Sequence, residues 1–224
     1  LEPRVQGLQP AAASRRFPSY LAPAMTQLPE LPLTLSRQEI RKMIRQRRRA
    51  LTPEQQQEMG QQAATRMMTY PPVVMAHTVA VFLSFDGELD TQPLIEQLWR
   101  AGKRVYLPVL HPFSAGNLLF LNYHPQSELV MNRLKIHEPK LDVRDVLPLS
   151  RLDVLITPLV AFDEYGQRLG MGGGFYDRTL QNWQHYKMQP VGYAHDCQLV
   201  DKLPVEEWDI PLPAVVTPSK VWEW

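Results

Sequence analysis

Four of the chain's eleven glycines fall between Gly170 and Gly174, within the segment DEYGQRLGMGGGFYDRTL. Glycine adopts positive φ angles and lacks a Cβ, so backbone amides in such a segment can close around an anion. Arg168 could bind a phosphate oxygen through its charged fork, and Asp177 could hold a phosphate-bound Mg²⁺ ion. A helix running from Phe175 toward His185 would add the positive end of its dipole. The segment therefore predicts a phosphate-binding loop.

The known phosphate motifs do not describe this segment. It lacks G-x-x-x-x-G-K-[ST], and its glycines do not follow the G-x-G-x-x-G spacing. A glycine cluster alone also occurs in flexible surface turns, so an ordinary loop is the alternative interpretation. Arg168 and the residues from Phe175 to Arg178 favour a binding site, because a linker does not need that combination.

Composition narrows the class of protein. The chain has 224 residues, of which 44% are hydrophobic and 21% charged, and these values are typical of a globular protein. Its net charge of +1 disfavours a dedicated nucleic-acid binder. The single cysteine, Cys197, excludes an intramolecular disulfide and a multi-cysteine zinc site, and we expect a spectator thiol in a reducing, cytoplasmic setting. No apolar run approaches the roughly 18 residues of a membrane span, so no membrane partner is expected.

The chain divides into an irregular tail and a patterned domain. Residues 1–33 are rich in proline and show no sustained periodicity, so we expect an extended or disordered tail. Met25 is an alternative start, and part of this tail need not be native coding sequence. Residues 34–224 are expected to form one domain, in which capping-box patterns at Ser36 and Thr52 begin two helices.

Short apolar runs alternate with helical patterns in the rest of this domain. We expect a helix that begins at Thr91 and ends at Gly102, and strands at 78–84, 103–109, 118–123, 153–157, 190–194 and 214–217. The strand–helix–strand unit over residues 78–109 predicts a parallel pair. This pattern indicates an α/β layered domain, in which ligands bind beyond the carboxyl ends of the strands.

Several motifs, taken in order, resemble the 5-formyltetrahydrofolate cyclo-ligase family, also called methenyltetrahydrofolate synthetases. The most specific is RLG-x-G-x-GFYD-R-x-L, from Arg168 to Leu180. It is accompanied by FLSFDGELDT, GKRVYLP, the Glu138-Pro139 pair, LDVLITPLVAFDEYGQRLG and LPVEEWDIPLPAVVTP, so that the resemblance extends from about Ser36 to Pro218. It implies a Rossmann-like three-layer α/β/α domain of the phosphosugar isomerase and CoA transferase-like group.

The resemblance also implies an activity. Members of the family use ATP and Mg²⁺ to convert 5-formyltetrahydrofolate to 5,10-methenyltetrahydrofolate, with release of ADP and phosphate. The formyl oxygen is phosphorylated and N10 then attacks the activated carbon. We therefore expect a monomeric enzyme whose partners are this folate and ATP. A non-catalytic folate- or nucleotide-binding domain of the same fold is the alternative. A protein that binds RNA through the basic run from Arg37 to Arg49 is the less favoured one.

Roles follow by motif position, and no residue is expected to act as a nucleophile. The residues implied for ATP are Arg37, Arg41, Arg168, Leu169, Gly170, Met171, Gly172, Gly173, Gly174, Phe175 and Tyr176. Those implied for folate are Leu83, Glu88, Met171, Gly172, Gly173, Gly174 and Phe175, and those implied for Mg²⁺ are Asp177 and Asp209. In this interpretation the Glu88 carboxylate accepts hydrogen bonds from the pterin, whose amino-pyrimidine edge is an array of donors.

Two features of the sequence leave alternatives open. Relatives often carry Arg or Lys where this chain has Met171 and Gly173, so Arg168 or Arg178 would have to supply positive charge beside the phosphates. The aromatic residues that could wall a pterin also fit ordinary packing, and they are Phe85, Tyr123, Tyr176 and Trp208.

Overall fold

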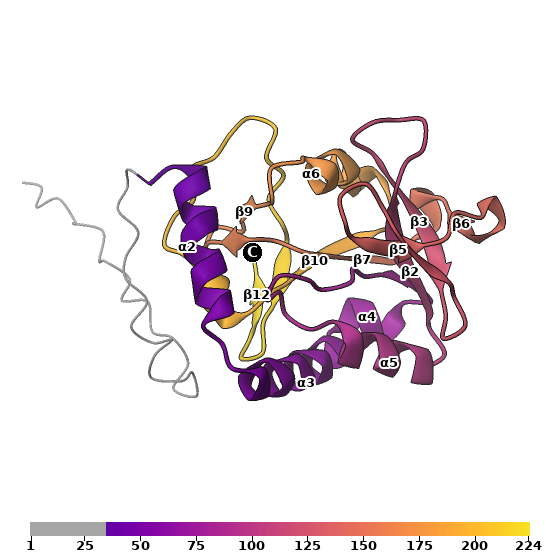
Figure 1. The fold of residues 1–224 in the computed structure, drawn as a ribbon, viewed down its shortest axis with the longest axis horizontal. Coiled ribbons are helices and arrows are strands. Elements are labelled where there is room, and N and C mark those ends of the chain that lie inside the picture. The colour runs from indigo at the N-terminus through magenta and orange to yellow at the C-terminus, as the bar shows by residue number, and fades with distance from the viewer. Residues whose placement is uncertain (1–34) are drawn as a thin grey trace, which may run out of the picture.

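A central sheet with helices on both faces is the main feature of the computed structural model, which describes residues 35–224 (Figure 1). The predicted tail, residues 1–33, lies outside the described residues. The sheet has eight strands in the order β12-β11-β10-β7-β1-β2-β3-β6. Its parallel centre consists of β1 (Thr78–Ala80), β2 (Arg104–Leu110), β7 (Val154–Thr157), β10 (Gln189–Tyr193) and β11 (Ala214–Val216). Antiparallel strands complete its edges: β12 (Val221–Glu223), β3 (Leu118–Tyr123) and β6 (Val146–Leu147).

The first two helices of the described range begin at the predicted capping boxes. The Ser36 hydroxyl accepts a hydrogen bond from the Glu39 amide at 3.1 Å and so begins α2 (Arg37–Arg49). The Thr52 hydroxyl accepts one from the Gln55 amide at 3.1 Å and begins α3 (Pro53–Thr69). After α4 (Pro71–Met75), α5 (Gln92–Arg100) connects β1 to β2, and these two strands are parallel as predicted.

Side chains alternate between the two faces of each central strand, and each face carries its own core. Val79 of β1 and Val105 of β2 pack in the core that contains α3, α4 and α5. Their neighbours Ala80 and Tyr106 pack in the opposite core, which contains Leu180 of α6 (Phe175–Leu180). The two helical layers are seen on opposite sides of the sheet in Figure 1. The predicted three-layer α/β/α arrangement is therefore confirmed.

Helix α2 packs separately at one end of the sheet. Ile40 and Ile44 are buried against Ala161 and Leu169, which belong to a two-stranded hairpin of β8 (Ala161–Phe162) and β9 (Arg168–Leu169). Because β9 leads directly into the glycine-rich segment, this packing holds α2 beside the predicted phosphate loop.

Two predicted boundaries were wrong. β1 ends at Ala80 instead of residue 84, because the Phe82 carbonyl accepts a hydrogen bond from the Thr91 hydroxyl at 2.7 Å and the chain leaves the ladder. The helix that begins at Phe175 ends at Leu180 instead of running toward His185. Asn182 has a left-handed φ of 59°, and the chain continues as a 3₁₀ turn, η3 (Trp183–His185).

The remaining elements are short, and none of them was predicted. A hairpin of β4 (Leu129–Met131) and β5 (His137–Pro139) stands beside the end of β2. Three further 3₁₀ turns are η1 (Val143–Asp145), η2 (Leu149–Arg151) and η4 (Asp196–Gln198).

Candidate functional site

A cavity of about 540 Å³ opens where β1, β2 and β7 end. Leu83 and Pro158, in the segments that leave β1 and β7, and Pro108, near the end of β2, contribute to its wall. The cavity therefore lies at the carboxyl ends of the parallel strands, where ligands of such sheets are expected to bind. Nearly all of the residues implied for ATP, folate or Mg²⁺ line it, namely Arg37, Arg41, Leu83, Glu88, Arg168, Gly170, Met171, Gly172, Gly173, Gly174, Phe175, Tyr176 and Asp177.

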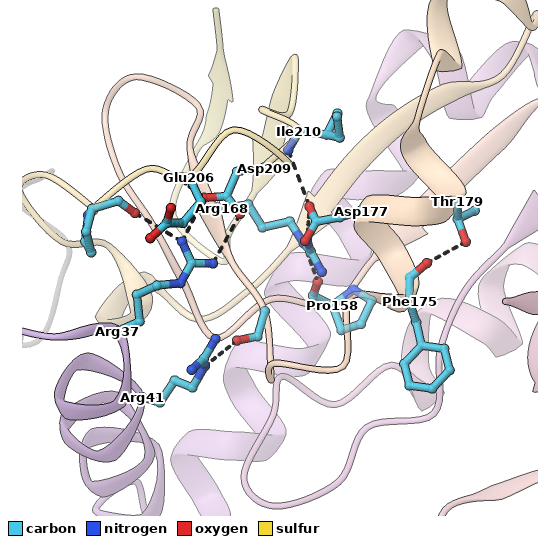
Figure 2. A network of polar contacts seen from close by, with 12 residues as sticks. Arg37, Arg41, Pro158, Arg168, Phe175, Asp177, Thr179, Glu206, Asp209 and Ile210 are labelled. Carbon is cyan, nitrogen blue, oxygen red and sulfur yellow. Dashed lines mark hydrogen bonds and ion pairs between the residues drawn. The ribbon is translucent and has the colours of Figure 1, made fainter. Parts of the chain in front are cut away.

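Leu169 and Asp209 are the implied residues that do not line the cavity. The Leu169 side chain is buried with Ile40 and Ile44, so this residue could contact a ligand only through its backbone. The Asp209 carboxylate is bound by Arg37, which itself lines the cavity, and the pair is drawn in Figure 2.

The glycine-rich loop needs glycine at two positions for a steric reason. Gly172 and Gly174 have φ angles of 106° and 70°, which side chains other than glycine rarely adopt. A Cβ on Gly174 would also lie 2.8 Å from the guanidinium of Arg178. Nε of Arg41 donates to the Gly170 carbonyl at 2.7 Å, which joins α2 to the first residue of the loop.

Arg168 is the buried cation of the site. Its Nε donates to the Pro158 carbonyl at 3.2 Å, and its Nη1 donates to Oδ1 of Asp177 at 3.2 Å. Its guanidinium carbon lies 5.7 Å from the centre of the Tyr176 ring. Burial lowers the pKa of Arg168 from its ordinary value, while the nearby Asp177 carboxylate raises it. The guanidinium is therefore fixed in direction on the cavity wall.

Two arginine–aspartate pairs lie next to each other at this end of the cavity (Figure 2). Arg37 donates to both oxygens of Asp209, at 2.7 and 3.1 Å, and Asp209 also accepts from the Glu206 amide at 2.8 Å. The charge of Asp177 helps to raise the pKa of Arg37, after the larger effect of its hydrogen bond to Asp209. We call Arg37, Asp209, Arg168 and Asp177 the charge quartet, and its four charges sum to zero.

The two carboxylates of the charge quartet differ in what they offer to a metal ion. Asp177 lines the cavity, and its contacts with Arg168 and with the Ile210 amide at 3.4 Å are both made through Oδ1. Asp209 has both oxygens engaged. Within residues 35–224 no group of three or more His, Cys, Asp or Glu side chains gathers to hold a metal. The set therefore fits an ion such as Mg²⁺ that takes one or two carboxylates and completes its shell with phosphate and water.

Glu88 stands at the opposite part of the cavity, in a turn after β1. Its Oε1 accepts a hydrogen bond from the Phe85 amide at 3.1 Å. Burial raises the pKa of the Glu88 carboxyl from 4.5 to about 7, although the hydrogen bond and the charge of Arg48 act in the other direction. A half-buried carboxylate beside Leu83 and Phe85 is suited to a planar donor edge.

The aromatic candidates divide into wall residues and a packing residue. Phe85, Tyr176 and Trp208 line the cavity, and Trp208 is 64% exposed. Tyr123 does not line it; its ring centre lies 5.1 Å from that of Trp99, with which it packs against the first core. Of the two interpretations left open for Tyr123, the structure supports ordinary packing, because the alternating pattern of β3 turns this side chain toward α5.

The unpredicted hairpin closes the cavity on its remaining side. Asn132, Ile136 and Glu138 line it. Oε2 of Glu138 accepts from Nδ2 of Asn132 at 3.0 Å and from the Leu110 amide at 3.0 Å, so the hairpin is bonded to the end of β2. The Glu138-Pro139 pair was the only sequence signal for this wall.

Arg168 and Arg178 differ in position. These are the two arginines that could supply the positive charge for which relatives often carry Arg or Lys at the positions of Met171 and Gly173. Met171 is 57% exposed at the cavity, and Arg168 faces the same space. Arg178 is not among the residues that line the cavity. It donates to the Gly116 carbonyl at 2.6 Å and to the Gly173 carbonyl, and so joins the glycine-rich loop to the segment that contains Gly116. Of the two, only Arg168 is placed to face a ligand in the cavity.

Two further predictions from the sequence concern the single cysteine and the basic run of α2. Burial raises the pKa of Cys197 to about 12, so this thiol stays protonated and unreactive, as a spectator would. In the basic run of α2, Arg37 and Arg41 face the cavity, and Arg45 and Arg49 pair with Asp86.

None of the helices in the described range has the length and hydropathy needed to cross a membrane.

Comparison with known proteins gives one family. The model of the 5-formyltetrahydrofolate cyclo-ligase family matches residues 34–218. The chain is 99% identical over 182 residues to the 5-formyltetrahydrofolate cyclo-ligase of Escherichia coli, covering 81% of this chain and 100% of that protein. It is 52% identical over 179 residues to that of Haemophilus influenzae, covering 80% and 96%. Among solved structures, the 5,10-methenyltetrahydrofolate synthetase of Aquifex aeolicus matches with a TM-score of 0.72 and 28% identity, over 84% of this chain and 93% of that one.

Proposed function

The chain belongs to the 5-formyltetrahydrofolate cyclo-ligase family, and we propose that it converts 5-formyltetrahydrofolate to 5,10-methenyltetrahydrofolate with MgATP, releasing ADP and phosphate. The observation that carries the proposal is that one cavity brings together the glycine-rich loop, the two arginines of α2 and Glu88. These groups come from segments far apart in the sequence, and each has the chemistry that one part of this reaction requires.

The nucleotide end of the cavity is the glycine-rich loop with its arginines. Arg41 binds the backbone of the loop at Gly170 and Arg168 binds the carbonyl of Pro158, and both arginines line the cavity. Phosphate oxygens would replace the Asp209 and Asp177 carboxylates as partners of Arg37 and Arg168. The loop amides, freed from side-chain crowding at Gly172 and Gly174, would supply further donors.

The folate end is the turn that carries Glu88. In this proposal the Glu88 carboxylate accepts hydrogen bonds from the pterin edge, and the apolar walls at Leu83, Phe85 and Trp208 cover the rings. The formyl group then faces the phosphate end. The cavity volume of about 540 Å³ lies within the range of about 300–1,000 Å³ common for small-molecule sites.

The reaction needs activation of a poor leaving group. The formyl oxygen attacks the γ-phosphorus of ATP and ADP leaves, which converts that oxygen into part of a phosphate. N10 attacks the formyl carbon, the phosphate leaves with the former formyl oxygen, and N10 loses its proton. Phosphoryl transfer depends on positioning and charge neutralisation, so Arg168 and the loop would act by holding the phosphates in line. No protein nucleophile is required.

Mg²⁺ is part of the proposal, and when bound it would neutralise phosphate charge. Asp177 is the carboxylate that already faces the cavity and would hold it directly. Asp209 would join only when Arg37 exchanges this carboxylate for a phosphate group. A monomeric state and a cytoplasmic location, expected from the sequence, belong to the proposal as well.

The test is incubation with 5-formyltetrahydrofolate, with and without MgATP, while methenyl absorbance and ADP are recorded together. We expect one ADP per methenyl product and neither product without MgATP. Binding of both ligands with no absorbance change would instead support a non-catalytic folate- or nucleotide-binding domain. Asp142→Asn is a matched control variant, because it removes an ion-paired aspartate of η1 that does not line the cavity.

A further inference from the structure

Helix α2 contacts both ends of the proposed active site. Its first turns carry Arg37 and Arg41, which bind Asp209 and the glycine-rich loop. Its last turns carry Arg45, Arg48 and Arg49, and all three reach the same carboxylate, that of Asp86. Asp86 lies two residues before Glu88 in the turn that forms the folate end.

The turn from Phe85 to Glu88 has a defined shape. Asp86 and Gly87 have φ angles of 52° and 76°, and the Glu88 amide donates to the Phe85 carbonyl at 3.1 Å. The Phe85 amide in turn donates to the Glu88 carboxylate at 3.1 Å. The direction of the Glu88 side chain is therefore set by the conformation of the turn.

Side chains from outside the turn hold it at two points, the Gly87 carbonyl and the Asp86 carboxylate. The Gly87 carbonyl accepts hydrogen bonds from Nε2 of Gln56 at 3.1 Å and from Nε2 of His195 at 3.1 Å. Arg49 donates to Oδ1 of Asp86 through Nη2 at 2.7 Å and through Nε at 3.0 Å. The hydrogen bonds to the Gly87 carbonyl attach the turn to α3 and to the segment after β10. The ion pairs of Asp86 attach it to α2.

The three arginines around Asp86 differ in burial and in their distance from its carboxylate. Arg49 and Arg45 are largely exposed and lie 2.7 and 3.3 Å from the carboxylate. Arg48 is buried, with its Nη2 at 3.8 Å. Asp86 is thus a single acid facing three cations of one helix, and a non-glycine residue with positive φ, which Asp and Asn tolerate better than other side chains.

We propose that Asp86 is a positioning residue for folate, which fastens the Glu88 turn to the arginines of α2 and so aims the Glu88 carboxylate into the cavity. This inference rests on the proposed role of Glu88 in binding the pterin. It adds a residue outside the cavity wall to the determinants of folate affinity.

Electrostatics provide a signature that distinguishes positioning from general support of the fold. The charged and titratable groups that face Glu88 are Asp86 in its own turn, Arg48 of α2, Tyr176 of α6 and His195. The negative charge of Asp86 raises the pKa of Glu88, and the positive charge of Arg48 lowers it. His195 is held neutral, since burial lowers its pKa to about 4. Loss of the Asp86 charge therefore lowers the pKa of Glu88.

The experiment measures binding of 5-formyltetrahydrofolate by calorimetry without nucleotide, from pH 5.5 to 8.5, for wild type, Asp86→Asn, Glu88→Gln and the control Asp142→Asn. Asparagine keeps the tolerance for positive φ and removes only the charge. We expect Asp86→Asn to weaken folate binding at pH 8 by on the order of tenfold. The pH below which folate affinity falls, near 7 in wild type, should move to lower pH. MgATP affinity should stay within about twofold of wild type.

The outcomes separate this inference from the proposed function. Unchanged folate affinity and an unchanged pH midpoint in Asp86→Asn would overturn the inference, while a large loss in Glu88→Gln would still support the folate site. Wild-type affinity in Glu88→Gln would overturn both. Arg49→Gln removes the two shortest contacts of Asp86 and keeps its charge, so it provides the affinity test where Asp86→Asn does not fold.

Discussion

Glu88→Gln is expected to stabilise the protein at pH 8 while it weakens folate binding. In the folded protein the pKa of Glu88 is raised to about 7 by burial, against an ordinary value of 4.5. Between these two pH values the native state keeps a proton that the unfolded state has lost. The free energy of unfolding therefore falls as the pH rises through this window. Glutamine has the same shape and still accepts from the Phe85 amide, but it does not titrate.

The size of the effect follows from the two pKa values. Each unit between them corresponds to 1.36 kcal/mol, so full ionisation of Glu88 in the fold costs about 3 kcal/mol. The side chain is half-buried, and screening by solvent reduces this to about 2–3 kcal/mol. The difference in unfolding free energy between Glu88→Gln and wild type should change by that amount from pH 4.5 to pH 8, in favour of the variant.

Urea unfolding of both proteins at four pH values between 4.5 and 8 measures this difference, and comparison with wild type cancels the other titrating groups. Calorimetry at pH 8 should show the opposite effect on function: folate binds at least about tenfold more weakly, because a glutamine amide presents a donor to the pterin donors. A pH-independent stability difference would refute the burial argument. Folate binding equal to wild type would refute the assignment of Glu88.

Three further outcomes are expected. Burial lowers the pKa of His195 from 6.5 to about 4, so the neutral imidazole contributes about 3 kcal/mol of stability that is lost as the pH falls through this window. Because Glu88 titrates in the opposite sense over a similar range, the measurement is the difference in unfolding free energy between His195→Gln and wild type in urea, which should change by about this amount in favour of the variant as the pH falls. Asp177→Asn should lower turnover by about tenfold or more at low Mg²⁺ while folate binding, measured by calorimetry, is unchanged; normal turnover would exclude this carboxylate as the metal ligand. Deletion of residues 1–42 removes Arg37 and Arg41 and should raise the KM for MgATP by about tenfold or more in steady-state assays, whereas deletion of residues 1–24 should be silent; equal KM values would show that neither arginine binds ATP.

Local patterns predicted those parts of the fold that depend on neighbouring residues. The starts of α2 and α3 follow from side chains three positions apart, and the parallel pairing of β1 with β2 follows from the strand–helix–strand order of residues 78–109. The end of α6 also depends on a nearby residue, Asn182, but asparagine is tolerated inside helices as well as in the left-handed region, and the prediction extended the helix past it.

The arrangement of the site depends on contacts between distant segments, which no periodicity encodes. Arg37 and Asp209 are 172 positions apart, and the sequence alone left Asp209 looking like an ordinary surface acid. The wall at Asn132 and Glu138 depends on how a short hairpin docks on β2. The sequence left the role of Tyr123 open for the same reason, because the direction of its side chain is fixed by the sheet and not by its neighbours in the chain.

The charge quartet keeps the charges of the proposed phosphate site paired within the protein. Arg168 and Asp209 are almost fully buried, and an unpaired charge at either position would cost several kcal/mol. Pairing each arginine with an aspartate removes that cost, but it also occupies the groups proposed to bind phosphate and metal. A ligand of one sign could satisfy only half of the quartet and would leave the other half unpaired. MgATP carries both signs, so phosphate can replace the aspartates on the arginines while the metal takes the released carboxylates. Under the proposed function, the same pairing would therefore favour the metal–nucleotide complex over either component alone.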